Sequence, residues 1–228
     1  MKKIIALAAL AAISATASAA GNLFTDGSFE SLSSGGGWTI DTGSAGVLGD
    51  GWTVGLAPKT ASGGAPVGLE VRQSGVAGTA EDGKHFIELD GNQNDMISQS
   101  LKTVAGHEYQ ISFYVADRPD QSAAFLATSG GYGYSIASTI PGVPGGPYTL
   151  YSGASDTGTF GTKWVEESFD FTAISTSTKF SIWATGTSDS LGTSFDNFQA
   201  VAVPEPATLG LFAAGIAVLG LSARRRRQ

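Results

Sequence analysis

Four tyrosines in a glycine-rich stretch are the residues whose chemistry best suits contact with a sugar. Residues 129–162 hold two Gly-Gly pairs and three prolines around them. A sugar ring presents C–H groups that pack on a flat aromatic face and hydroxyl groups that need polar partners, and tyrosine offers both. Glycine lets the backbone approach a ligand closely. We predict a binding loop here, with a self-packed loop as the alternative; its ligand residues would be Tyr132, Tyr134, Tyr148 and Tyr151.

Residues that carry out catalysis are sparse in this chain. His85 lies beside an apolar stretch and His107 lies in a glycine-containing turn, and neither belongs to a metal-binding or nucleophile motif. Glu166 and Glu167 are adjacent in a strand-like stretch, so their carboxylates point to opposite faces and cannot flank one glycosidic bond. We therefore predict no catalytic residue, although carboxylates distant in sequence can still meet in the fold.

An acidic stretch matches only part of a calcium-binding loop. Asp90, Asn92 and Asn94 fit its first half, but Asp95 stands where glycine is needed and Leu101 where a bidentate glutamate is needed. The segment is therefore predicted to be a turn. The chain contains no cysteine, which excludes disulfides and cysteine-ligated metal sites.

Strands must position these residues, because apolar side chains recur at every second position between clusters of Gly, Ser, Asp and Pro. Tyr109, Ile111, Phe113 and Val115 show this alternation most clearly. The pattern predicts an all-β fold of about nine or ten strands in a β-sandwich or jelly roll. The strand-like stretches lie near Phe24 and Phe29 and at residues 52–56, 67–71, 85–89, 96–101, 109–115, 124–128, 164–171, 180–182 and 195–201.

The connections between these stretches are predicted from their glycine, asparagine and proline content. Residues 90–95 would join the stretches on either side as a hairpin, since Gly and Asn tolerate positive φ. Residues 31–65 and 129–162 are predicted to be long loops. Three tryptophans in strand-like stretches are predicted to have a core or structural role: Trp52, Trp164 and Trp183.

The N-terminal residues have the composition of a secretory signal peptide. Lys2 and Lys3 supply a positive region, an apolar stretch follows, and Ala17 and Ala19 form a small-residue cleavage site. We therefore expect residues 1–20 to be removed on export.

The C-terminal segment, residues 203–228, has three parts. Pro204-Glu205-Pro206 precedes an uncharged stretch, residues 207–223, that reaches roughly 26 Å as a helix, enough for a thin bilayer. The segment ends in four arginines that would stay in the cytoplasm, Arg224, Arg225, Arg226 and Arg227. This layout resembles a PEP-CTERM sorting tail. A buried terminal helix is the alternative, but it would place four like charges beside the core.

The resemblance to a sorting tail implies partners and a location. In such proteins a membrane-bound exosortase reads the Pro-Glu-Pro motif, after the secretion machinery has exported the chain and the C-terminal helix has held it in the membrane. These systems belong to Gram-negative bacteria that make exopolysaccharide. We therefore expect export through the inner membrane to the cell surface or the extracellular matrix.

The remaining residues, 21–202, are enough for one domain with a substantial core. Without Lys2, Lys3 and the four arginines, 7 of the 13 basic residues remain; without Glu205, 19 of the 20 acidic residues remain, so the domain carries a net charge of −12. Such a charge repels nucleic acid and anionic polysaccharide unless a divalent cation intervenes. We therefore expect neutral glycan or metal-bridged partners, and no nucleic acid.

Short motifs along this domain follow a familiar order. Their succession is similar to galactose-binding-like jelly rolls, which include carbohydrate-binding modules, and to the choice-of-anchor C family of exported bacterial domains. The motifs are NLFTDGSFE at 22–30, GWTV at 51–54, FIELDG at 86–91, ISQSL at 97–101, AGHEYQISF at 105–113, FDFTA at 169–173 and FDNF at 195–198.

The resemblance implies a metal site and a function. Related jelly rolls hold one structural Ca²⁺ where the first and last motifs meet, which here implicates the Glu30 and Asp196 carboxylates with backbone carbonyls near Thr25 and Asp26; solvated strand-end residues are the alternative. It also implies a non-catalytic exported protein that binds polysaccharide or cell-wall glycan through loops or a sheet face. The alternatives are a matrix protein cross-linked by divalent cations and, less favoured, a glycan-active hydrolase.

Overall fold

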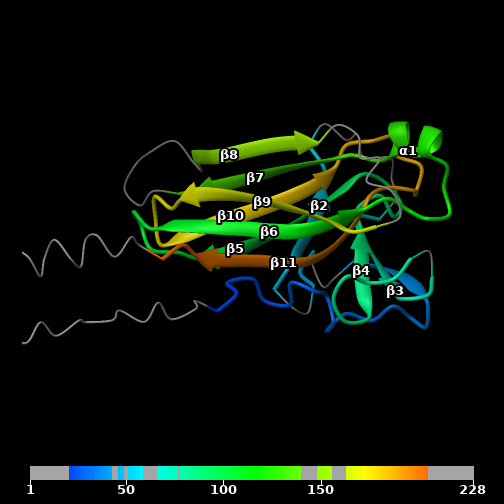
Figure 1. The fold of residues 1–228 in the computed structure, drawn as a ribbon, viewed down its shortest axis with the longest axis horizontal. Helices are drawn as coiled ribbons and strands as arrows, with labels where there is room; N and C mark the ends of the chain where they lie inside the picture. The colour runs from blue at the N-terminus through cyan, green and yellow to red at the C-terminus, as the bar shows by residue number, and fades with distance from the viewer. Residues whose placement is uncertain are drawn as a thin grey trace, which may run out of the picture. The chain divides into compact units, whose positions relative to one another are not determined.

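Two antiparallel sheets enclose an aromatic core in the computed structural model, which describes residues 21–42, 46–48, 51–58, 66–76, 78–139, 148–155 and 163–204. The six-stranded sheet has the order β1 (Trp38–Asp41), β3 (Leu69–Gln73), β4 (His85–Glu88), β11 (Ser194–Ala202), β6 (Glu108–Ala116), β9 (Val165–Thr172). The five-stranded sheet has the order β2 (Thr53–Leu56), β5 (Asp95–Lys102), β10 (Ser177–Ala184), β7 (Tyr132–Ser138), β8 (Tyr148–Ser155). Figure 1 shows the long strands β6 to β11 running along the long axis of the view.

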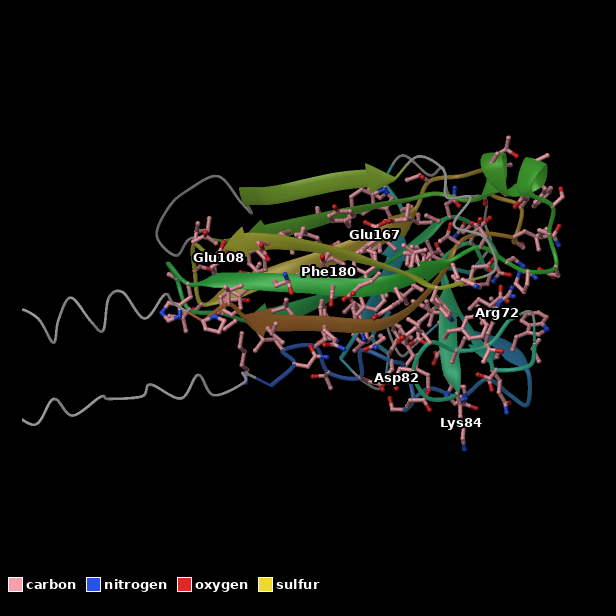
Figure 2. All side chains as sticks on the ribbon, in the orientation of Figure 1. Arg72, Asp82, Lys84, Glu108, Glu167 and Phe180 are labelled. Atoms are coloured by element: carbon pink, nitrogen blue, oxygen red, sulfur yellow. The ribbon has the colours of Figure 1, made fainter. Side chains whose placement is uncertain are left out.

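The predicted all-β sandwich is confirmed, and alternation explains it. In β6 the side chains of Tyr109, Ile111, Phe113 and Val115 are buried, whereas Gln110 on the opposite face is exposed. The inward residues of both sheets form one hydrophobic cluster. Phe180 of β10 is fully buried in this cluster and lies in the middle of the molecule in Figure 2.

The N-terminal segment closes this core without forming a strand. Strands were expected near Phe24 and Phe29, but residues 22–32 form turns and bends, and Phe29 has a positive φ of 58°. Both phenylalanine rings nevertheless pack on Trp52, with ring centroids 5.2 Å and 5.6 Å away. Phe24 and Phe29 are both buried, but burial alone does not impose extended backbone.

The predicted hairpin across residues 90–95 is wrong. Strand β4 pairs with β3 and β11, whereas β5 pairs with β2 and β10, so the chain changes sheets between them. The segment is a turn, as expected, with an isolated bridge between Asp90 and Asn94. Alternation shows which face of a strand is buried, but it does not identify the neighbouring strand.

Two further element predictions are corrected by the structure. Residues 124–128 were expected to form a strand but lie in helix α1 (Ala123–Ser129), because a short apolar run suits either element. The two stretches predicted as long loops contain unexpected strands: β1 lies within residues 31–65, and β7 and β8 lie within 129–162. Strand β2 agrees with the strand-like stretch predicted at residues 52–56. Glycine and serine in β7 concealed its alternation.

The predicted targeting segments lie mostly outside the described residues. This applies to residues 1–20, with Ala17 and Ala19, and to residues 205–228, with the proposed helix and the arginines. Pro204 is the last described residue and is exposed. No helix within the described part of the chain has the length and apolar character needed to cross a membrane.

Candidate functional site

The outer face of the five-stranded sheet carries two contrasting rows of side chains. Ile97 and Ile182 pair across β5 and β10 and face the core. The residues next to them along each strand therefore face outward. Cross-strand pairing aligns one row as Gly55, Met96, Trp183, Gly133 and Ala154. The next row aligns hydroxyl residues on four strands, Thr53, Ser98, Ser181 and Ser135; Ser98 and Ser181 are buried, whereas Thr53 and Ser135 are half-buried.

A single glycine determines the position of the outward-facing tryptophan. A Cβ atom on Gly133 would lie 2.6 Å from two carbons of the Trp183 indole. The ring therefore lies across strand β7 at a position where only glycine leaves room for it. Trp183 is only partly buried, so it keeps an accessible aromatic surface next to the hydroxyl row.

A polar groove of about 550 Å³ adjoins this face. Its lining includes Thr53, Ser98 and Ser100 together with two cationic side chains, Lys102 and Lys179. The hydroxyls of Thr53 and Ser98 lie 2.7 Å apart, so they hydrogen-bond each other and hold a fixed orientation. The face and groove together offer an aromatic surface, hydroxyl groups and positive charge. We call them the β5–β10 platform.

The four predicted tyrosines do not lie in a loop. Tyr132 is 1% exposed in strand β7, and its ring packs edge-on against Phe113 and Phe195 in the core. Tyr134 is partly buried and stacks on Phe169, with centroids 4.9 Å apart. Tyr148 and Tyr151 lie in β8, at register positions opposite Ser138 and Ile136. All four tyrosines therefore lie on strands, and ligand contact by them stays a prediction.

The two carboxylates expected to hold calcium bind opposite ends of one loop. Asp196 Oδ2 accepts the backbone N–H groups of Glu81 and Asp82, at 2.7 Å and 3.0 Å. Glu30 Oε1 accepts the N–H groups of Lys84 and His85, both at 2.7 Å. Residues far apart in sequence thus bind one loop, each through backbone N–H donors.

Other contacts occupy the remaining residues of the expected calcium site. Asp26 accepts the backbone N–H and the hydroxyl of Ser31, and the Thr25 backbone pairs with the Gln99 side-chain amide. Calcium needs six to eight oxygen ligands. Within the described residues no cluster of three or more His, Asp or Glu side chains is arranged to hold a metal. The described geometry therefore does not itself assemble a calcium site, and calcium binding stays a prediction.

Burial changes the protonation of Asp196. The carboxyl group is fully buried, and desolvation raises its pKa to about 7 although backbone N–H groups of Asp82, Asn197 and Glu81 lower it. A β-bulge in β11 between Asp196 and Gln199 places the side chain here, with Asn197 at a positive φ of 48°. Sequence alone gave no sign of this bulge.

A buried ion network lies on the other sheet. Arg72 Nη2 contacts Glu70 at 2.7 Å and Glu88 at 3.1 Å, and Arg118 holds Asp120 through two 3.0 Å bonds. Glu88 is fully buried, and desolvation raises its pKa. Figure 2 labels Arg72 beside β3 and β4. Arg118 Nη1 also contacts Glu88 at 3.4 Å, so the network links the segment after β6 to these strands.

Trp183 was predicted to have a core or structural role, but it lies on the outer face and outside the hydrophobic core. The sequence holds the signal for this, because the apolar Phe180 and Ile182 are two residues apart and share one face. Strict alternation then puts Trp183 on the opposite face, together with Lys179. By contrast, Trp52 is fully buried, as predicted.

Comparison with known proteins identifies the C-terminal segment. Residues 202–227 match the PEP-CTERM protein-sorting motif. The chain therefore carries the sorting motif predicted from Pro204-Glu205-Pro206, and the motif indicates an exported protein. No curated protein matches the chain.

Solved structures resemble the domain in fold. A Stig cyclase, Fisc from Fischerella sp. TAU, solved with (3Z)-3-(1-methyl-2-pyrrolidinylidene)-3H-indole, matches with a TM-score of 0.56 and 17% identity over 83% of this chain and 100% of that chain. TmCBM61, solved with β-1,4-galactotriose, has a TM-score of 0.45 and 16% identity over 80% and 99% of the two chains. A family 16 carbohydrate-binding module matches with a TM-score of 0.47 and 16% identity over 79% of this chain and 99% of that chain. At these identities the likeness concerns the fold alone.

Proposed function

We propose that this protein is an exported, non-catalytic domain that binds polysaccharide through the β5–β10 platform. The observation that carries the proposal is the indole of Trp183, laid across Gly133 beside a row of hydroxyl residues. Carbohydrate binding requires this combination, because C–H faces of a sugar pack on the ring while sugar hydroxyls exchange hydrogen bonds with polar neighbours. Several solved structures similar in fold are named as carbohydrate-binding modules, which is consistent with the proposal.

The proposed mechanism is shallow contact rather than enclosure. From Trp183 to Lys179 is four residues of one strand, about 14 Å at the usual rise. A ligand that touches both ends therefore spans more than one sugar ring, which favours a polymer. The platform forms on rigid strands, so little ordering of the protein accompanies binding.

The sorting motif supplies the location in this proposal. An exosortase would read Pro204-Glu205-Pro206, and the exported domain would then meet polysaccharide at the surface or in the matrix of a Gram-negative cell. The predicted residues 207–223 would hold the chain in the membrane until this step. Mass spectrometry of the extracellular protein tests this, since an intact C-terminus after residue 206 would contradict processing.

Retention on immobilised polysaccharides tests the platform. Wild-type protein should migrate more slowly in a native gel that contains a polysaccharide ligand than in a gel without it, and Trp183→Ala should abolish this retardation. Gly133→Ala should weaken it, because the added Cβ meets the indole. Trp38→Ala is the matched control: Trp38 is 59% exposed on the six-stranded sheet, so its loss should leave binding unchanged.

The same preparations separate the alternatives. Release of reducing sugar would contradict the non-catalytic assignment. Aggregation that calcium alone induces, without retardation in its absence, would instead favour the cross-linked matrix protein. Equal retardation of wild type and Trp183→Ala would reject the platform.

A further inference from the structure

Two lysines lie together on the platform. Lys102 of β5 pairs with Ser177, and Lys179 of β10 pairs with Ser100, so the lysines are diagonal neighbours on the outer face. Such positions are about 7–8 Å apart between strands. Both side chains are exposed and both line the 550 Å³ groove.

Neither lysine has an anionic partner in the described parts of the chain. Arg72 and Arg118 each contact carboxylates, but no described carboxylate lies within ion-pair distance of Lys102 or Lys179. No Asp or Glu stands among the described residues that line the groove. In a domain with a net charge of −12, two unpaired neighbouring cations are an exception that the overall charge does not reveal.

Placing like charges side by side is unfavourable unless an anion lies near both. Ser100, exposed and opposite Lys179, provides a hydroxyl group next to the charges. The hydroxyl row and Trp183 continue along the same face. The groove therefore suits a ligand that joins negative charge to sugar rings.

We propose that the groove selects an acidic polysaccharide, with Lys102 and Lys179 binding carboxylate groups of its sugar units. This inference rests on the proposed function and specifies its ligand class. It reverses the expectation of a neutral glycan, which followed from the average charge of the domain. The two lysines offer local positive charge to carboxylates spaced along a sugar chain, whereas duplex DNA, with one charge per about 1.7 Å, meets stronger repulsion from the acidic remainder of the surface.

Affinity measurements with polygalacturonate test the proposal, with galactan as the uncharged probe. Wild-type protein should bind polygalacturonate about tenfold more tightly than galactan at low salt, and the preference should shrink as salt is raised. The double variant Lys102→Gln/Lys179→Gln should lose this preference. Both sites are exposed, and an unchanged Tm will show that the variant folds.

A matched charge control comes from Lys84→Gln. Lys84 is exposed and points away from the body of the protein in Figure 2. It directly precedes β4 of the six-stranded sheet, whereas Lys102 and Lys179 lie on the five-stranded sheet. This variant removes one positive charge without touching the platform, so it should keep the wild-type preference. A loss equal to that of the double variant would show a general charge effect and overturn the inference.

The remaining arms distinguish anions from acidic sugars. Dextran sulfate or duplex DNA bound as tightly as polygalacturonate would overturn carboxylate selection. Galactan bound as tightly as polygalacturonate, with dependence on Trp183, would overturn this inference and leave the proposed function standing. Absence of binding to every polysaccharide would remove both.

Discussion

Single residues in this protein have properties set by what surrounds them. Asp196 resembles any other aspartate in the sequence, but full burial raises its pKa to about 7, far above the ordinary value near 4. Below about pH 7 the neutral carboxyl is then favoured in the folded state, whereas in the unfolded chain Asp196 loses its proton near pH 4. The stabilising contribution is therefore complete below about pH 4 and is lost as pH rises through 7.

This gives a prediction for Asp196→Asn. The amide has one acceptor oxygen in place of two, so at pH 5 the variant should lose about 1–3 kcal/mol of unfolding free energy. It does not ionise, so its deficit relative to wild type should shrink between pH 5 and pH 8. Urea unfolding at these pH values measures the difference. Asp170→Asn, at an exposed position, serves as control, and parallel pH profiles for wild type and Asp196→Asn would contradict the assignment.

Among the elements, the irregular N-terminal segment does as much for the core as a strand does. Phe29 is fully buried, tilted against Trp52 at 5.6 Å and edge-on to Phe198 at 5.7 Å. The motif at 22–30 is therefore part of the folded domain although it forms no strand; its backbone makes two hydrogen bonds to β11, at Leu23 and Gly27. A turn can hold it because the backbone N–H of Ser31 donates to the Asp26 carboxylate and so fixes the backbone locally.

Phe29→Ala should cost about 3–5 kcal/mol of unfolding free energy, because it leaves a cavity beside the rings of Trp52 and Phe198. Val104→Ala is the control: Val104 is 52% exposed, and its replacement should change stability by less than about 0.5 kcal/mol. Chemical denaturation measures both variants. If Phe29→Ala lowered the free energy of unfolding as little as Val104→Ala, the N-terminal segment would not be part of the cooperatively folded unit.

For the molecule as a whole, the open question is whether an ion adds to the stability that packing and hydrogen bonds provide. The Glu30 and Asp196 carboxylates hold residues 81–85 from two sides, so ordering of this loop depends on both ends of the domain. A calcium ion bound to the folded state alone would stabilise it by about 2.7 kcal/mol at one hundred times its Kd.

If the predicted calcium site exists, calcium should raise the Tm of wild-type protein and a chelator should reverse the effect. Glu30→Ala should lose the response, whereas Glu108→Ala, on strand β6, should keep it. Differential scanning calorimetry with and without calcium makes the comparison. Equal Tm values for wild type in both conditions would reject the site.

Sequence patterns alone determined the class of the fold and the sorting motif, since both depend on local order: alternation along a strand, and Pro-Glu-Pro before an apolar stretch and arginines. The succession of motifs also implicated Glu30 and Asp196 together; both carboxylates bind residues 81–85, and a calcium site there stays a prediction. Sequence patterns do not identify which strands pair, and for this reason the prediction of a hairpin across residues 90–95 is wrong. Nor did they separate small-residue strands from loops, which misplaced Tyr132.

Tertiary structure decided the candidate site, because its parts come together only through sheet register. Gly133 and Trp183 are fifty residues apart in sequence, so no pattern within a single strand could connect them. They touch because β7 and β10 pair. Lys102 and Lys179 become neighbours for the same reason. Long-range pairing follows from the sum of all contacts in the sandwich, and so the charge and aromatic groups of the platform appear only when the sheets are assembled.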